Sequence, residues 1–84
     1  MRTWLVTGGA GFIGSSFVLA ERKLGQVRVI NLDHLTYAGN PLNLEPLRDD
    51  PDHIFFRGNI GDRALVRQIL QEFHPCAVLN FAAE

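Results

Sequence analysis

The sequence has little of what marks several common classes of protein. It contains one cysteine, Cys76, which cannot form an internal disulfide and fits a reducing compartment. Its 8 basic and 9 acidic residues nearly balance, and no basic cluster favours nucleic acid or an anionic membrane as a partner. No apolar run approaches the length of a membrane span, and the N-terminus lacks the pattern of a signal peptide. We therefore expect a cytoplasmic protein that binds neither nucleic acid nor membranes.

Metal ligands and catalytic groups are also scarce. The three histidines, His34, His53 and His74, share no metal-ligand spacing, and a single cysteine does not complete a set. No serine or cysteine stands in a recognisable pairing with a general base. The sequence therefore predicts no metal site and no catalytic residue. At 84 residues the chain allows one small domain, residues 1–84.

What the sequence does contain is a glycine-rich turn close to its start. An apolar strand over Thr3–Val6 leads into Val-Thr-Gly-Gly-Ala-Gly-Phe-Ile-Gly at positions 6–14. The spacing from Gly9 is G-x-G-x-x-G, and from Gly8 it is G-x-x-G-x-x-G. In a strand–turn–helix context, Gly9 permits a sharp turn, with a positive φ as one option, and Gly11 lets a pyrophosphate approach the backbone. Gly14 allows the helix to pack closely on the strand, and the helix N-terminus attracts the anion. The alternative is a purely structural turn.

The segment after the turn predicts a helix over Phe12–Leu24. Apolar residues recur at helical spacing and predict one buried face, formed by Ile13, Phe17, Ala20 and Leu24. Arg22 is expected on the solvent side, and Gly25 is well placed to end the helix.

Strands and helices alternate through the rest of the chain. We expect strands over Val27–Leu32, ending at Asp33, over His53–Arg57 and over Cys76–Phe81, a short helix after Pro41, and a helix over Arg63–Phe73 capped by Asp62 with Leu65, Val66, Ile69, Leu70 and Phe73 on its apolar face. This alternation predicts the α/β class, as the N-terminal part of a Rossmann-type doubly wound parallel sheet. Right-handed crossovers give about four strands in the order 3-2-1-4, numbered along the chain.

Asp33 is the strongest candidate for a nucleotide contact outside the turn. It ends the second strand, nineteen residues after Gly14, where an acidic side chain accepts hydrogen bonds from the adenosine ribose hydroxyls. A 2′-phosphate beside this carboxylate would be repelled by about 1–4 kcal/mol at ~4 Å. No arginine follows Asp33 to offset that repulsion, so the sequence predicts NAD rather than NADP. The alternative is a strand-end acid that caps a turn.

Two further segments follow strand ends. The side-chain oxygen of Asn59 could accept a hydrogen bond from the adenine amino group, and Ile60 would supply an apolar wall; a simple turn residue is the alternative at Asn59. The small residues of Phe81-Ala82-Ala83 would let a cofactor lie along the edge of the sheet.

These residues also carry a family likeness, which extends over the whole chain. The glycine turn at 6–14 resembles that of extended short-chain dehydrogenases/reductases. More specifically, Leu-Asp-His-Leu-Thr-Tyr-Ala-Gly-Asn at 32–40 is similar to a segment of dTDP-glucose 4,6-dehydratases. Phe-Arg-Gly-Asn-Ile-Gly-Asp at 56–62 and Leu-Asn-Phe-Ala-Ala-Glu at 79–84 match later blocks of those enzymes.

The resemblance implies an NAD-dependent lyase that acts on a nucleotide sugar. In such enzymes NAD+ takes hydride from C4 of dTDP-glucose, water leaves across C5–C6, and hydride returns to C6. The full-length protein would then be a homodimer with dTDP-glucose as substrate. The expected cofactor contacts, from motif and resemblance together, are Gly8, Gly11, Phe12, Ile13, Gly14, Asp33, His34, Thr36, Ala38, Gly39, Asn59, Ile60, Phe81 and Ala83.

The chain departs from that family pattern at two of these positions. His34 stands where the family usually has lysine. Asn59 stands where it usually has aspartate, and asparagine keeps the acceptor oxygen without the charge. The family's Tyr-x-x-x-Lys pair, its dehydrating acids and its sugar-binding domain have no counterpart in residues 1–84. The alternatives are an NAD-dependent nucleotide-sugar 4-epimerase or decarboxylase, and a non-catalytic NAD-binding module.

Overall fold

The computed structural model describes residues 1–34 and 41–81. Its centre is a parallel four-stranded sheet in the order β3-β2-β1-β4, built from β1 (Arg2–Thr7), β2 (Val27–Asp33), β3 (His53–Arg57) and β4 (Ala77–Asn80). The predicted class, strand order and strand positions are confirmed to within one or two residues at the strand ends.

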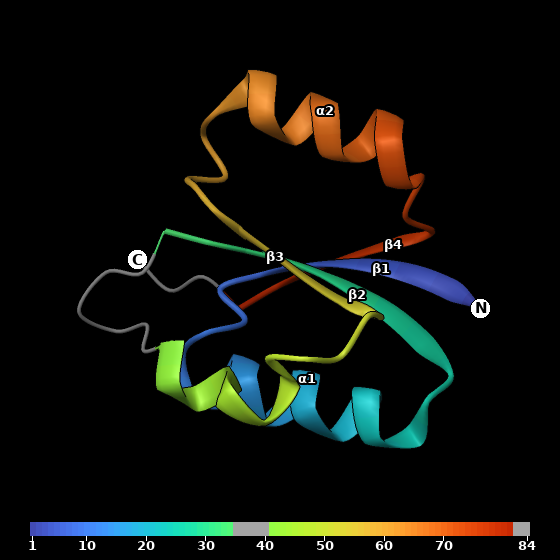
Figure 1. The fold of residues 1–84 in the computed structure, drawn as a ribbon. Helices are drawn as coiled ribbons and strands as arrows, with labels where there is room; N and C mark the ends of the chain where they lie inside the picture. Colours follow the sequence, from blue (N-terminus) through green and yellow to red (C-terminus); the bar gives the residue numbers. More distant parts are fainter. Residues whose placement is uncertain (35–40, 82–84) are drawn as a thin grey trace.

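Helices cover both faces of this sheet (Figure 1). On one face, the α1 face, lie the helix α1 (Phe12–Leu24) and the short 3₁₀-helix η1 (Pro41–Leu47). On the other, the α2 face, lies the helix α2 (Arg63–Phe73). No helix in the described part of the chain is long and apolar enough to cross a membrane.

The alternation of side chains along each strand produces two separate cores. On the α1 face, Val18 packs with strand residues and with the leucines of η1, in a cluster of Val6, Ala10, Val18, Val27, Val29, Leu44 and Leu47. On the α2 face, Ile69 packs with Leu5, Ile30 and Leu32. The sheet therefore holds α1 and α2 in place through different sets of contacts.

The buried face of α1 differs from the predicted one. Its fully buried residues are Gly14, Ser15 and Val18, whereas Ile13, Ala20 and Leu24 are exposed and Phe17 is partly buried. A small polar residue such as Ser15 can be buried because its hydroxyl donates to the Phe12 carbonyl oxygen at 3.1 Å. The face predicted from the spacing of apolar residues is therefore wrong at Ile13, Ala20 and Leu24.

Phe17 is the residue of the predicted face that does pack against the sheet. Its ring lies 6.1 Å from that of Trp4 and 5.2 Å from that of Phe81, measured between centroids. These three rings connect α1 to β1 and to the chain just beyond β4. Phe17 therefore joins the first helix to the last strand of the described chain.

The C-terminal end of α1 is fixed by a glycine and an arginine. Gly25 ends the helix in the left-handed conformation, with φ of 72°, as predicted. Arg22, expected in solvent, instead has a side chain that is 9% exposed. Its guanidinium donates to Asp50 at 2.8 Å and to the Val27 carbonyl oxygen at 2.6 Å. A long side chain can satisfy its charge under the surface, which the sequence pattern did not reveal.

The helix α2 follows the prediction closely. The Asp62 side chain accepts a hydrogen bond from the Leu65 amide at 3.2 Å, the expected N-cap. Ile69 is fully buried, and Leu65, Val66 and Phe73 pack beside it. The exception is Leu70, which is exposed, because it lies at the margin of the face that meets the sheet.

Candidate nucleotide-binding site

The glycine turn leads from β1 into α1 through a single left-handed residue. Gly8 has φ of 73°, so it, and not Gly9, supplies the positive φ that the sequence left open. Gly11 is the N-cap of α1, in an extended conformation. Its amide donates to the Gly8 carbonyl oxygen at 3.3 Å, which closes the turn.

Gly9 and Gly14 are required for a different reason, which is lack of space. A Cβ atom on Gly9 would overlap the side-chain amide of Asn31. A Cβ atom on Gly14 would overlap the carbonyl oxygen of Gly8 and lie 3.0 Å from the Gly9 Cα. The first turn of α1 is therefore packed directly on the glycine turn that follows β1, where the sequence predicts packing on the strand.

The N-terminus of α1 has no side-chain cap of its own. Gly11 provides no side-chain cap, and the first turn of the helix contains no acidic residue. Phe12 and Ile13, at the same helix end, are 82% and 72% exposed. The amide groups and the positive end of the helix dipole thus lie next to an exposed apolar surface, an arrangement suited to an anion attached to a larger ligand.

Asp33 lies against this turn. The residue is almost buried, at 7% exposure, and its carboxylate accepts a hydrogen bond from the Ala10 amide at 2.9 Å. The carbonyl oxygen of Ala10 in turn accepts a hydrogen bond from the Asn43 side chain of η1, also at 2.9 Å. Ala10 is therefore fixed from two sides. Sequence reasoning missed both contacts, since they involve backbone groups and residues far apart in the chain.

The carboxyl ends of the strands meet in one row. Backbone amides bridge neighbouring strand ends, from Gly8 to Leu32 at 3.0 Å, from Gly58 to Asp33 at 3.1 Å and from Phe81 to Thr7 at 2.7 Å. This row brings together the glycine turn, Asp33, the segment that begins at Gly58, and Phe81. The parallel sheet thus brings together predicted contacts as far apart in the chain as Gly8 and Phe81.

The remaining predicted contacts divide into two groups. Asn59, Ile60 and His34 are exposed near the strand ends, and the Asn59 side-chain oxygen accepts from the Gly61 amide at 2.8 Å. That bond gives Asn59 a turn-forming role, and its contact with adenine stays a prediction. Thr36, Ala38, Gly39 and Ala83 lie outside the described residues.

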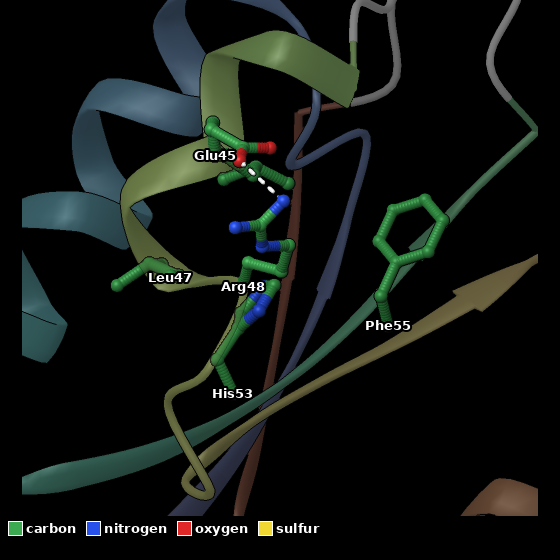
Figure 2. A pocket seen from close by; sticks show the side chains of 6 residues that line it. Glu45, Leu47, Arg48, His53 and Phe55 are labelled. Carbon is green, nitrogen blue, oxygen red and sulfur yellow. Dashed lines mark ion pairs between the residues drawn. The ribbon is translucent and has the colours of Figure 1, made fainter.

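A cavity of about 310 Å³ lies elsewhere on the α1 face, between η1 and β3 (Figure 2). Phe55 forms one wall, and Glu45 and Arg48, paired at 3.0 Å, lie across from it. Its other lining residues are Leu44, Leu47 and His53. None of the predicted cofactor contacts lines this cavity, so the glycine turn and the strand ends remain the candidate site.

Within residues 1–34 and 41–81, no three histidine, cysteine or acidic side chains are grouped so as to hold a metal ion.

Comparison with protein families identifies the chain's wider group. Residues 4–84 match the model of the NAD dependent epimerase/dehydratase family. The chain belongs to this family. The match includes the glycine turn, Asp33 and the segment that follows β3.

Known members of the family resemble the chain over its whole length. The dTDP-glucose 4,6-dehydratase of Xanthomonas campestris pv. campestris (strain B100) is 63% identical over 84 residues, which is 100% of this chain and 24% of that protein. The chain therefore spans about a quarter of the length of the curated relatives it matches.

Solved structures of the family show the same fold. A dTDP-glucose 4,6-dehydratase from Bacillus anthracis, solved in complex with NAD, matches with a TM-score of 0.94 and 40% identity over 100% of this chain and 27% of its own. The UDP-glucose 4-epimerase of Thermus thermophilus, also solved with NAD, matches with a TM-score of 0.80 and 36% identity over 99% of this chain and 24% of its own. The four-stranded arrangement is thus shared by dehydratases and epimerases of the family.

Proposed function

We propose that this chain is the NAD-binding portion of a dTDP-glucose 4,6-dehydratase. The observation that carries the proposal is the contact between Asp33 and the glycine turn. Because the Asp33 carboxylate accepts from the Ala10 amide, the acid expected at the ribose and the turn expected at the pyrophosphate are joined by a hydrogen bond. An adenosine diphosphate moiety needs both parts at a fixed separation.

The residues present fit this cofactor. The uncapped N-terminus of α1 and Gly11 suit the pyrophosphate, and the exposed side chains of Phe12 and Ile13 suit the apolar parts of the nucleotide. Asp33 would accept hydrogen bonds from the ribose, with Asn59 and Ile60 at the adenine. The bound nicotinamide would accept and return the hydride that dehydration of the sugar requires.

The part of each step that falls to this chain is binding and orientation. Residues 1–84 include none of the acid, base or sugar-binding groups that the family resemblance calls for, so we assign them to the remainder of a longer protein. Its relatives, about four times as long as this chain, support that assignment. The single cysteine supports a cytoplasmic location, and the resemblance supports a homodimer.

The experiment is an assay of the intact protein with dTDP-glucose and NAD. A dehydratase converts the substrate to dTDP-4-keto-6-deoxyglucose, which NMR identifies by its C6 methyl group. Formation of the 4-epimer would replace this proposal with an epimerase, the alternative favoured by the likeness to the Thermus thermophilus enzyme. Binding of NAD without turnover of any nucleotide sugar would instead indicate a non-catalytic module.

Asp33 provides the matched test of cofactor binding. Asp33→Ala removes the ribose acceptor and the partner of the Ala10 amide, and we expect NAD affinity to fall at least about 30-fold by isothermal titration calorimetry. Glu72→Ala is the control, since Glu72 is an exposed acidic residue near the C-terminal end of α2. It should leave NAD affinity within about twofold. Equal NAD affinity in both variants would contradict the assignment of Asp33.

A further inference from the structure

Arg57 is brought next to Asp33 by the pairing of β2 and β3. The two residues are register partners in adjacent parallel strands, so their Cα atoms lie about 5 Å apart. Partners in a parallel pair have side chains on the same face of the sheet. The backbone bond from Gly58 to the Asp33 carbonyl oxygen, at 3.1 Å, holds this end of the two strands together.

The charge of Arg57 is not used within the described part of the protein. Arg22, Arg28 and Arg48 each form an ion pair with a carboxylate. In contrast, Arg57 is exposed and forms no ion pair with any residue of 1–34 or 41–81. Its guanidinium is therefore available to a ligand at the carboxyl end of the strands.

This placement changes the electrostatics expected at the ribose. From the sequence alone, Asp33 has no arginine after it and should repel a 2′-phosphate. The sheet, however, supplies an arginine from β3, twenty-four residues further along the chain. A guanidinium can bind phosphate through two parallel hydrogen bonds, so it can offset the repulsion from a neighbouring carboxylate.

We propose that Arg57 is a specificity-determining residue that lets the site accept the 2′-phosphate of NADP, with NAD still preferred. The proposal rests on the proposed function, in which Asp33 holds the adenosine ribose. Arg57 would contact the phosphate of NADP and would make little contact with the uncharged 2′-hydroxyl of NAD. The residue would then set the ratio of the two affinities without setting the affinity for NAD.

The test is calorimetric titration of the intact protein with NAD and with NADP. In the unmodified protein both should bind, NADP more weakly. Arg57→Gln should weaken NADP about tenfold and leave NAD within about twofold, because only the phosphate loses a partner. Arg57→Lys should retain part of the NADP affinity, since lysine keeps the charge and loses the paired geometry. The effect should shrink as salt is raised.

Arg67→Gln is the matched control. Arg67 is an exposed arginine of α2, so its loss removes one positive charge without touching the strand ends. It should leave the ratio of the two affinities unchanged. An equal ratio in Arg57→Gln and Arg67→Gln would overturn the proposal, as would equal losses for NAD and NADP in Arg57→Gln, or no NADP binding by the unmodified protein. Failure of the unmodified protein to bind NAD would instead overturn the proposed function.

Discussion

Gly9 and Gly14 lack side chains for two different physical reasons. At Gly9 the obstacle to a Cβ atom is the side-chain amide of Asn31, and at Gly14 it is the backbone of Gly8. Asn31 is fully buried, and its side-chain oxygen has no hydrogen-bond partner within the described residues. One obstacle can thus be removed by mutation and the other cannot.

We expect Gly9→Ala and Gly14→Ala each to destabilise the protein by about 1–3 kcal/mol, the usual cost of overpacking. Asn31→Ala should rescue Gly9→Ala, because it removes the amide that the new methyl group would meet. The same change should not rescue Gly14→Ala. Urea denaturation of the single and double variants measures the difference. Equal behaviour of the two double variants would contradict the contacts assigned to these glycines.

The sequence motif shows that these glycines belong to the turn, but it does not show which contacts require each of them. Spacing marks Gly9 as part of the turn, but the group that leaves no room for a side chain there is Asn31, a residue in the middle of β2. That contact depends on how β1 and β2 pair, which a local pattern does not contain. Gly8 shows the same point, since the sequence offered a positive φ only as one option at Gly9, and the structure has it at Gly8.

Among the elements, α1 is held at its C-terminal end by Arg22. Its nearly buried guanidinium binds Asp50 and the Val27 carbonyl oxygen. Arg22→Met should therefore cost about 1–3 kcal/mol, the range for losing hydrogen bonds to a charged group. Arg28→Met is the control, because Arg28 is largely exposed and pairs with Asp52 at 3.3 Å; it should cost less than about 1 kcal/mol. Thermal unfolding of both variants decides, and similar losses would contradict the role of Arg22.

His53, at the amino end of β3, should make the free energy of unfolding depend on pH. Burial lowers the pKa of His53 below its usual value, so the folded state holds this ring neutral where the unfolded chain begins to bind a proton. The free energy of unfolding should accordingly fall as pH drops below about 6.5. His53→Gln should flatten that slope, and His74→Asn, at an exposed position, should keep it. Urea denaturation between pH 5 and 8 is the measurement. An unchanged slope in His53→Gln would contradict the role assigned to His53.

A second loss of stability is expected at lower pH, from protonation of Asp50. The hydrogen bonds from the Arg22 guanidinium hold the pKa of Asp50 below its usual value. A lowered pKa means that this carboxylate adds stability above the pKa of the unfolded chain, about 3.9. That contribution is lost as the pH falls further. The pH range of the Asp50 effect lies below that of the His53 effect, so the two losses of stability can be measured separately.

The elements themselves were largely predictable, and their orientation was less so. Strand positions, the helix over Phe12–Leu24 and the Asp62 cap follow from local patterns of apolar residues and caps. The buried face of α1 does not, because Ser15 and Arg22 are placed inward by hydrogen bonds and Ile13 outward. Polar groups that find partners break the rule that links burial to hydrophobicity.

At the scale of the whole molecule, the sequence could predict which strand ends form the site but not which side chains meet there. Strand order places Asp33 and the glycine turn together. The exact register of β2 and β3 makes Arg57 the partner of Asp33, and the fold of the glycine turn brings the Ala10 amide to the Asp33 carboxylate. A shift of one residue would turn Arg57 to the opposite face, so this part of the site required the structure.

The division of the molecule into two cores leads to a prediction of additivity. Val18 and Ile69 are both fully buried, but they belong to separate clusters on the α1 and α2 faces. We expect Val18→Ala to cost about 1–3 kcal/mol and Ile69→Ala about 2–5 kcal/mol. The double variant should lose the sum to within about 0.5 kcal/mol, because sites without shared partners act independently. Val18→Ala combined with Val29→Ala, within one cluster, is the comparison and should deviate from its sum. A coupling above about 1 kcal/mol between Val18 and Ile69, measured by urea denaturation, would mean that the sheet transmits packing changes between its faces.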